Sequence, residues 1–429
     1  MSGFYITEQE MLMLLTLIPF FDRNMTVSAY SLFTRKQNFL TNPSLLGSRK
    51  YDGAAYADGL ELIQELGTGI LSGNKPIFVS INNISIFSDL ESQCQNPKDA
   101  PILLIDQSFP PVAMYTDRIR ALRTFGYHFA IRNLPVRCYE DYEPILSQMD
   151  YILIDCRETD VTKAALYFHM LYPDAAICAG NIPDQTTYRQ LCQSELIQMF
   201  EGTFFRTPIT QGEHTVSPLK INYIELLNLI QEKDFDLTKA ADIISRDTAL
   251  VISLLHMANT RAFNSEITSV RIAVSMVGQK ELVRWIQTAV IQRLCSDKPN
   301  ELMRLSLLRG KFAEELANVF EMGMRSQELF LVGLFSVLDI ILDCTMEEAL
   351  SMVSVSKEIR NALLDHKGEL ADVLNFIMKY EVADWEAVSR QMLLHKIEIP
   401  QVSAAWISSL KWYAKVLSTN LEPDSKERA

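Results

Sequence analysis

Three apolar, β-rich stretches of the sequence end in a charged residue, and these are the first places where the chain could do chemistry. The charged residues are Asp106, Arg132 and Asp155. Carboxylates at neighbouring strand ends could hold a hard divalent cation, which needs several oxygen ligands. An arginine among them would repel that cation. The simpler interpretation of Asp106 and Asp155 is that neighbouring amides or lysines satisfy them.

Histidines, cysteines and short motifs do not indicate another kind of catalytic site. The six histidines show no H-x-x-x-H spacing, and the seven cysteines include no C-x-x-C pair. An odd number of cysteines, several of them in apolar stretches, is typical of a reduced cytosolic protein. The sequence contains no G-x-S-x-G motif, P-loop or glycine-rich phosphate cradle, so an enzyme of another class is the weakest hypothesis.

The charge balance argues against nucleic acid and membrane partners. The 429 residues carry a net charge of −13, and the basic residues form no patch. Arg118, Arg120 and Arg123 are expected to lie on one solvated helix face. The apolar run from Met11 to Phe21 follows two glutamates and is too short to span a bilayer. We therefore expect it to be a buried helix or strand at the edge of the first domain, in a cytoplasmic protein.

The first half of the chain alternates between strand-like and helix-like stretches. The strand-like stretches are mostly continuous apolar runs, which are typical of strands covered on both faces. They are Val27–Thr34, Ile77–Ile81, Ile102–Asp106, His128–Arg132, Tyr151–Asp155, Ala175–Ala179 and Met199–Phe205. Repeated β-α order predicts a parallel sheet with helical crossovers, and about seven such units favour a closed (β/α) barrel like a TIM barrel.

The second half, from about Val216, is expected to be nearly all helix. Asp236 and Asp247 can each cap a helix, and Gly278 stands where a helix would end. We predict a barrel at residues 1–208, a linker at 209–217, an all-helical domain at 218–420 and a flexible tail at 421–429.

Several blocks of the second half resemble an HDOD domain. The first is "DLTKAADIISRDTALVISLLHMANTRAF", followed by "ITSVRIAVSMVGQKELVRW". Asp247, Leu250, Asn259 and Gly278 match the HDOD pattern, whereas Thr248 replaces its usual proline. The blocks "FLVGLFSVLDIIL" and "VSKEIRNALLDHKGELADVLNFIMKYEVADW" are similar to HDOD domains that follow degenerate EAL domains.

The first half is similar to that partner domain. "FFDRNMTVSAYSLFTR" resembles the first strand of the EAL domains found in EAL–HDOD proteins, and "MFEGTFFRTP" resembles the last EAL strand. Gly202, Phe205 and Pro208 match there, while Glu201 stands where glutamine is expected. The resemblance implies a cyclic di-GMP phosphodiesterase fold of two-domain EAL–HDOD architecture.

An active EAL enzyme uses two divalent cations held by carboxylates and an asparagine, supported by a lysine. By resemblance, the glutamate of E-x-L-x-R falls on Ser31, and its arginine is kept as Arg35. The asparagine falls on Ser80 or Asn82. The third-strand glutamate falls near Leu103, three residues before Asp106. Arg132 and Asn133 stand at the positions of the Asp-Asp pair. Leu153 stands at the position of the lysine, and the aspartate two residues later is kept as Asp155. Gly180 and Pro183 stand at the positions of two glutamates.

The exchange at Arg132 places a fixed positive charge where a dication would sit, so the resemblance implies a degenerate site with no metal and no cofactor. In the second half, Ser336 and Val337 stand where a true HD enzyme has its His-Asp metal ligands. Asp339 is expected to be a helix cap or a solvated carboxylate.

The sequence therefore predicts a catalytically inactive bacterial signalling adaptor. It would act through protein–protein contacts of both domains, with unidentified signalling proteins and a second copy of itself as partners. By resemblance, its pathways are cyclic di-GMP-related ones such as motility or biofilm control. The alternative is a non-catalytic sensor whose barrel binds cyclic di-GMP and signals to the HDOD domain.

Overall fold

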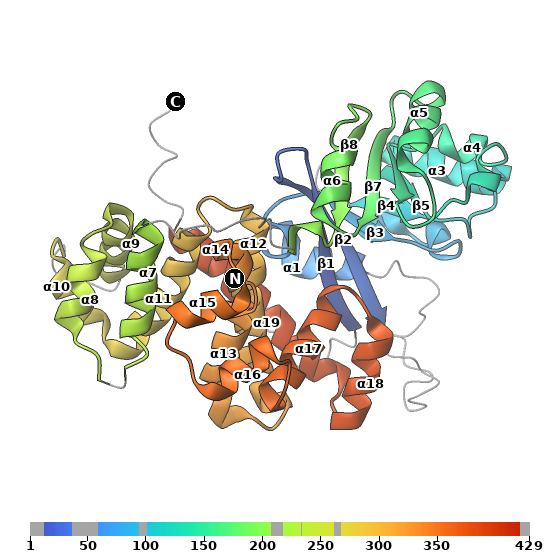
Figure 1. The fold of residues 1–429 in the computed structure, drawn as a ribbon. Coiled ribbons are helices and arrows are strands. Elements are labelled where there is room, and N and C mark those ends of the chain that lie inside the picture. Colours follow the sequence, from blue (N-terminus) through green and yellow to red (C-terminus); the bar gives the residue numbers. More distant parts are fainter. Residues whose placement is uncertain are drawn as a thin grey trace. The chain divides into compact units, whose positions relative to one another are not determined.

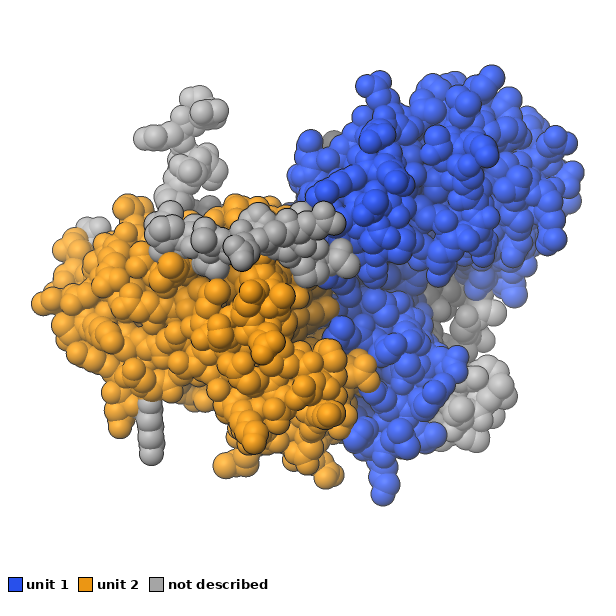
Figure 2. Space-filling model, viewed as in Figure 1, with its two compact units in different colours: residues 1–207, 378–407 blue, residues 208–377, 408–429 orange. Residues whose placement is uncertain are grey.

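The structure is a computed structural model of the chain, and it describes residues 13–36, 59–93, 101–206, 218–232, 234–260 and 267–420. The predicted linker at 209–217 and the predicted tail at 421–429 lie outside these ranges. The chain divides into two compact units, which Figure 2 colours separately. The barrel unit comprises Met1–Thr207 and Met378–Ile407, and the helical unit comprises Pro208–Ile377 and Ser408–Ala429.

Eight strands of the barrel unit form a closed barrel in which neighbours in sequence are neighbours in space (Figure 1). The strands are β1 Met13–Phe21, β2 Val27–Lys36, β3 Ile77–Ser80, β4 Ile102–Ile105, β5 His128–Arg132, β6 Tyr151–Asp155, β7 Ala176–Ile182 and β8 Ile197–Gly202. The steps from β2 to β8 are parallel. The predicted closed barrel is confirmed.

Strand β1 closes the barrel, and it is the apolar run that the sequence left open as helix or strand. It pairs antiparallel with β2 along its whole length, but with β8 only through Phe20 and Phe21. Nearly every residue of β1 is buried, which explains why this run is apolar without alternation.

Helices fill the crossovers between the parallel strands. They are α1 Leu60–Ser72, α2 Leu90–Gln93, α3 Ala113–Phe125, α4 Glu143–Leu146, α5 Val161–Leu171 and α6 Gln185–Leu191. Asp160 and Asp184 cap α5 and α6 by accepting hydrogen bonds from backbone amides of the first turn. The barrel interior packs around an apolar cluster made of Phe20, Ala29, Phe78, Ile102, Leu104, Ala130, Cys178 and Met199.

Helical residues from the far end of the chain belong to the barrel unit. The Tyr380 hydroxyl accepts a hydrogen bond from the Leu15 amide at 3.2 Å, and the Ser403 hydroxyl donates to the Met13 carbonyl at 2.8 Å. These contacts satisfy backbone groups in the part of β1 that does not pair with β8. Arg206 and the buried Glu381 form an ion pair at 3.2 Å in the same unit. Residues 378–407 therefore cover the part of the β1 edge that is not paired with β8 and hydrogen-bond to its backbone.

The second half is helical, as predicted. Its helices are α7 Pro218–Leu229, α8 Leu237–Ile244, α9 Thr248–Asn259, α10 Val270–Val277, α11 Gln279–Leu294, α12 Asn300–Val319, α13 Ser326–Phe335, α14 Leu338–Leu342, α15 Met346–Met352, α16 Lys357–Leu364, α17 Glu369–Glu381, α18 Trp385–His395 and α19 Ile399–Asn420. Asp236 and Asp247 cap α8 and α9 as expected. Across the residues that the structure describes, no helix has both the length and the apolar character that a membrane crossing needs.

Helices α12 and α13 approach each other at glycines. A Cβ atom built on Gly333 would lie 2.4 Å from the Arg309 carbonyl oxygen and 2.6 Å from the Gly310 amide nitrogen. No side chain fits there without moving one of the two backbones. This crossing brings Arg309 next to the end of α13, where the resemblance places the lost HD ligands.

Candidate functional site

The carboxyl ends of β2 to β8 form the barrel mouth, where the EAL resemblance places its catalytic groups. Successive strand residues face opposite sides of a sheet, so positions two apart from the interior cluster also face inward. This places Ser31, Ser80, Arg132, Leu153, Asp155, Gly180 and Glu201 on the inward face. The structure therefore brings most of the predicted positions together.

Arg132 ends β5, and its guanidinium reaches across the mouth. Its Nη2 lies 3.3 Å from the Ser80 hydroxyl of β3, and the guanidinium carbon lies 4.8 Å from the centre of the Phe33 ring of β2. Burial lowers the pKa of Arg132, while the negative charges of Glu201 and Asp106 act to raise it. Because an arginine starts from a very high pKa, it stays charged at neutral pH. A fixed cation thus stands between acidic residues of two other strands.

Asp155 ends β6 and is held by an arginine and an asparagine. Both of its carboxylate oxygens accept hydrogen bonds from Arg157, at 3.1 Å from Nε and 2.7 Å from Nη2, and Asn181 donates to it at 2.8 Å. Burial alone would raise the pKa of Asp155. The hydrogen bonds from Arg157 and Asn181 outweigh burial, so the pKa lies below its ordinary value. The carboxylate that the family pattern keeps is therefore already neutralised by residues of this chain.

Glu201 of β8 lies on the other side of the same cluster. Its Oε2 accepts a hydrogen bond from the Asn181 amide at 3.0 Å. Burial raises the pKa of Glu201, although that hydrogen bond and the charge of Arg132 act to lower it. A Cβ on Gly180 would lie 3.2 Å from the same oxygen. A glutamate at position 180, as in the EAL pattern, would crowd the carboxylate of Glu201.

The other predicted positions play smaller parts. The Ser31 hydroxyl is buried and has no hydrogen-bond partner among the described residues, and Arg35 is exposed at the end of β2. The Asn82 side chain accepts hydrogen bonds from two backbone amides of its own turn. Leu153 packs against the interior cluster. Asn133 has a left-handed backbone with φ 53°, and Pro183 is exposed.

Leu103 does not face the barrel mouth. It is fully buried, and its neighbours Ile102 and Leu104 both belong to the interior cluster, so the side chain of Leu103 points toward the covering helices. The inward polar residue at this strand end is Asp106, whose carboxylate accepts a hydrogen bond from the Ser108 amide at 2.8 Å. Phe200 likewise faces outward, with its ring 5.2 Å from that of Tyr188 on α6.

Sequence reasoning missed Arg157 and Asn181, which tie the ends of β6, β7 and β8 together. The signal for Asn181 was its type, because asparagine tolerates the left-handed backbone that it adopts here, with φ 57°. The signal for Arg157 was its spacing, two residues after an aspartate at a predicted strand end.

The helical unit has its own polar cluster at the predicted HD position. Arg309 is 3% exposed, and its Nη1 donates to the Ser336 hydroxyl at 3.0 Å. Val337 is buried. Asp339 lies in the first turn of α14 rather than at the cap residue, which is Val337, and its Oδ1 is buried without a hydrogen-bond partner among the described residues. Asp339 is therefore not the solvated carboxylate that we expected. Burial raises its pKa, and the charge of Arg309 acts in the opposite direction.

The residues that match the HDOD pattern serve the fold of the helical unit. Asp247 accepts hydrogen bonds from the Ala249 and Leu250 amides, from the Tyr223 hydroxyl, and pairs with Arg293 at 3.8 Å. Asn259 exchanges two hydrogen bonds with the backbone of Ile267, at 2.7 and 3.0 Å. These side chains cap a helix and fix a turn.

Within the described ranges, no three acidic, histidine or cysteine side chains gather in a way that could hold a metal ion. The barrel mouth instead holds charges of both signs, with Arg132 and Arg157 among Asp106, Asp155 and Glu201. Such a set can hold its own side chains in place and can present exposed cationic groups, such as Arg157, to an anionic ligand.

Residues 217–384 match the HDOD domain family. Over most of its length the chain is similar to an uncharacterized protein, YuxH, of Bacillus subtilis, with 24% identity covering 92% of this chain and 96% of the relative. It is also similar to the cyclic di-GMP phosphodiesterase CdgJ of Vibrio cholerae, with 24% identity covering 84% of each. Among solved structures, an EAL domain protein from Listeria monocytogenes covers 45% of this chain and 87% of its own length, with 15% identity and a TM-score of 0.35.

The prediction of an HDOD domain in the second half is confirmed by the family match. The closed barrel followed by helices confirms the fold class. The comparisons as a whole are consistent with an EAL–HDOD architecture.

Proposed function

We propose that this chain is a bacterial signal-transduction adaptor without catalysis of its own, built from an EAL-like barrel and an HDOD domain. It works in the cytoplasm through protein–protein contacts, in cyclic di-GMP-related control of motility or biofilm formation. The support is a barrel mouth whose acidic groups face arginines of the same chain, and an HD-equivalent position that holds serine and valine in the helical unit.

The observation that carries this proposal is the position of the Arg132 guanidinium, which contacts β2 and β3 and lies within the electrostatic influence of Asp106, directly after β4, and of Glu201 in β8. At about 4 Å, its repulsion of a divalent cation is on the order of several kcal/mol even with an effective dielectric constant near 20. The two metal ions that EAL phosphodiesterases use do not fit these residues. Asp155 would have to give up Arg157 and Asn181 to become a ligand.

Hydrolysis of cyclic di-GMP is the activity to test, because one relative is named a cyclic di-GMP phosphodiesterase. The full chain, incubated with cyclic di-GMP and Mg²⁺ or Mn²⁺, is expected to give no linear dinucleotide above background by chromatography. An active EAL phosphodiesterase in parallel reactions shows that the conditions support hydrolysis. Linear product that grows in proportion to the amount of this protein would overturn the proposal.

A second candidate, the non-catalytic cyclic di-GMP sensor, is favoured by one observation. Arg35 and Arg157 are both exposed at the barrel mouth, with 68% of the Arg157 side chain accessible, and could contact phosphates. Calorimetry separates the two candidates. The adaptor proposal expects no heat of binding at high micromolar cyclic di-GMP. The sensor expects binding that weakens when Arg35→Ala is introduced and does not change with Arg189→Ala, an exposed arginine on α6.

The partners of the adaptor are other signalling proteins and a second copy of the chain. A net charge of −13 disfavours DNA, RNA and anionic membranes. Light scattering coupled to size-exclusion chromatography is expected to give twice the 48.8 kDa of one chain. A mass of one chain at all concentrations would remove the homodimer from the proposal and leave the adaptor role intact.

A further inference from the structure

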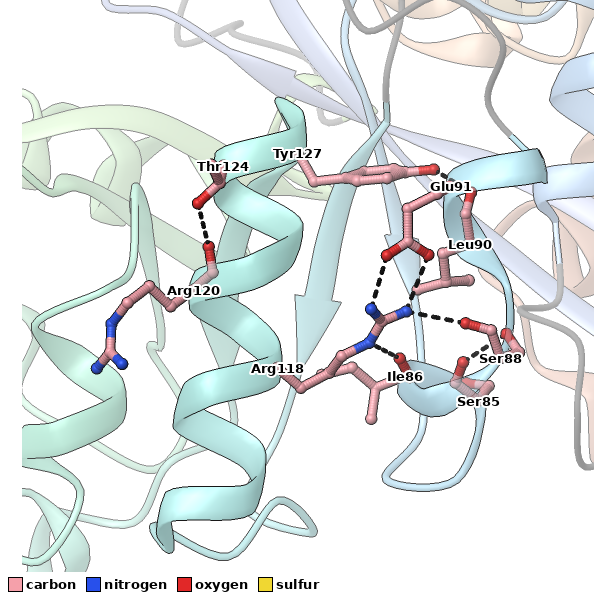
Figure 3. A network of polar contacts seen from close by, with 9 residues as sticks. All are labelled: Ser85, Ile86, Ser88, Leu90, Glu91, Arg118, Arg120, Thr124 and Tyr127. Atoms are coloured by element: carbon pink, nitrogen blue, oxygen red, sulfur yellow. Dashed lines mark hydrogen bonds and ion pairs between the residues drawn. The ribbon is translucent and has the colours of Figure 1, made fainter.

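The segment between β3 and α2 is a loop that contains a 3₁₀ turn at Ser85–Phe87, and one arginine contacts it at several points. Arg118 of α3 donates from Nε to the Ile86 carbonyl at 2.9 Å and from Nη2 to the Ser88 carbonyl at 2.9 Å. It also forms a two-pronged ion pair with Glu91 at 2.6 and 3.0 Å. Figure 3 shows the guanidinium pointing from the helix into the loop. Arg118 is thus part of the structure rather than of a solvated helix face, which corrects the expectation from the sequence.

Further contacts fix the same loop. The Tyr127 hydroxyl donates to the Leu90 carbonyl at 2.6 Å, and Ser88 donates to the Ser85 carbonyl at 2.7 Å (Figure 3). The Asn83 amide donates to the Ser108 carbonyl at 3.3 Å, which joins this loop to the one that follows β4. The two loops therefore form one ordered surface.

This ordered surface exposes apolar side chains. Ile84 is 59% exposed and Phe87 is 44% exposed on the first loop, and Val112 and Met114 are 50% and 59% exposed where α3 begins. The Phe87 ring lies 5.2 Å from that of Tyr115, the residue next to Met114. We call these four exposed side chains the loop patch. Single exposed apolar residues are ordinary, but four on these two joined loops and the first turn of α3 mark an interaction surface.

The ordering matters for binding. A loop that is fixed before binding loses little conformational entropy when a partner arrives, so a modest apolar contact can give measurable affinity. The hydrogen bonds of Arg118 to the Ile86 and Ser88 carbonyls fix the backbone on both sides of Phe87. Arg118 therefore helps to hold the loop patch in a conformation that a partner can bind.

The size of the loop patch limits its occupant. Four large side chains, each about half exposed, offer about 400 Å² of apolar surface. A stable protein–protein interface needs about 800 Å² from each partner, so the patch is too small to hold a second copy of the chain by itself. One face of a short helix has the matching size. The net charge of −13 favours basic residues beside that face, and exposed Asp89 lies next to the patch in sequence, whereas Asp117 is already paired with Arg120 at 2.8 Å.

Resting on the adaptor role proposed above, we infer that the loop patch docks a short amphipathic helix of a partner protein, with an apolar face and basic flanks. The test uses a fluorescently labelled synthetic peptide with leucines on one helical face and lysines on the other. Anisotropy titrations with the full chain are expected to give a Kd of tens of micromolar. Ile84→Ser combined with Met114→Ser is expected to weaken binding about tenfold or more.

Matched variants and peptides keep the test sharp. Leu166→Ser with Met170→Ser changes two exposed apolar residues on α5 of the same barrel unit and is expected to leave binding unchanged. Arg118→Gln keeps the patch residues but frees the loop, and is expected to weaken binding several-fold. A peptide with serines in place of leucines is expected not to bind, and one with glutamates in place of lysines is expected to bind more weakly.

Three results would overturn the inference. They are equal affinity of the Ile84→Ser/Met114→Ser variant and the unmodified chain, absence of binding by the leucine–lysine peptide, and tighter binding by the glutamate peptide. A dimer that this double variant abolishes would identify a second copy as the occupant instead. None of these outcomes bears on the adaptor proposal, which is tested separately by the hydrolysis and calorimetry experiments with cyclic di-GMP.

Discussion

The barrel mouth and the HD-equivalent region of the helical unit each place an arginine near an aspartate, but the pKa of the aspartate is lowered in the first and raised in the second. In the mouth, Asp155 is fully engaged by Arg157 and Asn181, and hydrogen bonds hold its pKa low. In the helical unit, Asp339 keeps one buried oxygen without a partner among the described residues, and burial raises its pKa even though Arg309 is near.

The barrel mouth can therefore still bind a ligand or partner, whereas the Arg309 region of the helical unit serves to stabilise the fold. Arg132 and Arg157 lie where solvent reaches, so their charges could be redirected toward a partner without unfolding the barrel. Arg309 is 3% exposed and sits at a crossing where two backbones touch. We expect changes in the helical region to affect stability, and changes in the mouth to affect binding far more than stability.

The largest effect is expected from Gly333→Ala. The new Cβ would lie 2.4 Å from a backbone oxygen of α12, so the two helices must separate. We expect the helical unit to lose about 3 kcal/mol of unfolding free energy. Gly323→Ala is the control, because its Cβ would meet only the Asn318 side chain, which can move. Urea unfolding, monitored by hydrogen exchange in the helical unit, measures the stability of both variants. Equal stability of the two would show that α12 and α13 are not tightly packed at Gly333.

Arg309→Met and Arg132→Met compare the two arginines directly. Removing Arg309 leaves the Ser336 hydroxyl without this donor and takes the balancing charge from Asp339, so we expect a loss of about 2–3 kcal/mol. Arg132 is half buried, and its hydrogen bond to Ser80 is long at 3.3 Å, so we expect a loss under about 1 kcal/mol. The measurement is urea unfolding of each variant. A greater loss at Arg132 would reverse the comparison.

Tyr380→Phe tests how strongly residues 378–407 are part of the barrel unit. The variant keeps the ring of this fully buried residue but removes the acceptor of the Leu15 amide. We expect a loss of about 1–2 kcal/mol and faster hydrogen exchange in β1, while exchange in β6 stays unchanged. Unchanged exchange at Leu15 would mean that the helices cover the barrel without supporting β1.

Much of this architecture could be predicted from the sequence because strand and helix signals are local. The continuous apolar runs indicated buried parallel strands, and Asp236 and Asp247 marked helix starts that the structure shows. The role of β1 was harder to predict. An apolar run alone does not distinguish a strand from a buried helix, and its closing partners, β8 and residues 378–407, lie far away in sequence.

The sequence predicted which residues lie at the barrel mouth, but not which of them contact each other. The strand-like runs ended at Arg132 and Asp155, and the EAL resemblance placed Glu201 in the last strand of the same barrel. Neither could show that Arg157 would turn back onto Asp155, because that depends on the local path of the chain after β6. The engagement of Arg118 with the loop after β3 was missed for a related reason, since 27 residues separate it from Glu91.

The smallest effect expected is a difference in pH dependence between Asp155→Asn and Asp339→Asn. Asp155 has a lowered pKa, so its contribution to stability is present above about pH 4 and is lost as the pH falls through its folded-state pKa. Asp339 has a raised pKa, so its contribution is complete below about pH 4 and is lost as the pH rises through its folded-state pKa. Asp155→Asn should therefore be less stable than the unmodified chain above about pH 4, and this deficit should shrink as the pH falls toward 2. Asp339→Asn should gain stability relative to the unmodified chain between pH 4 and pH 7, and we expect each change to be about 1 kcal/mol. Thermal unfolding at pH 2, 4 and 7 measures both differences, and differences that change with pH in the same direction would mean that the two carboxylates respond alike to their surroundings.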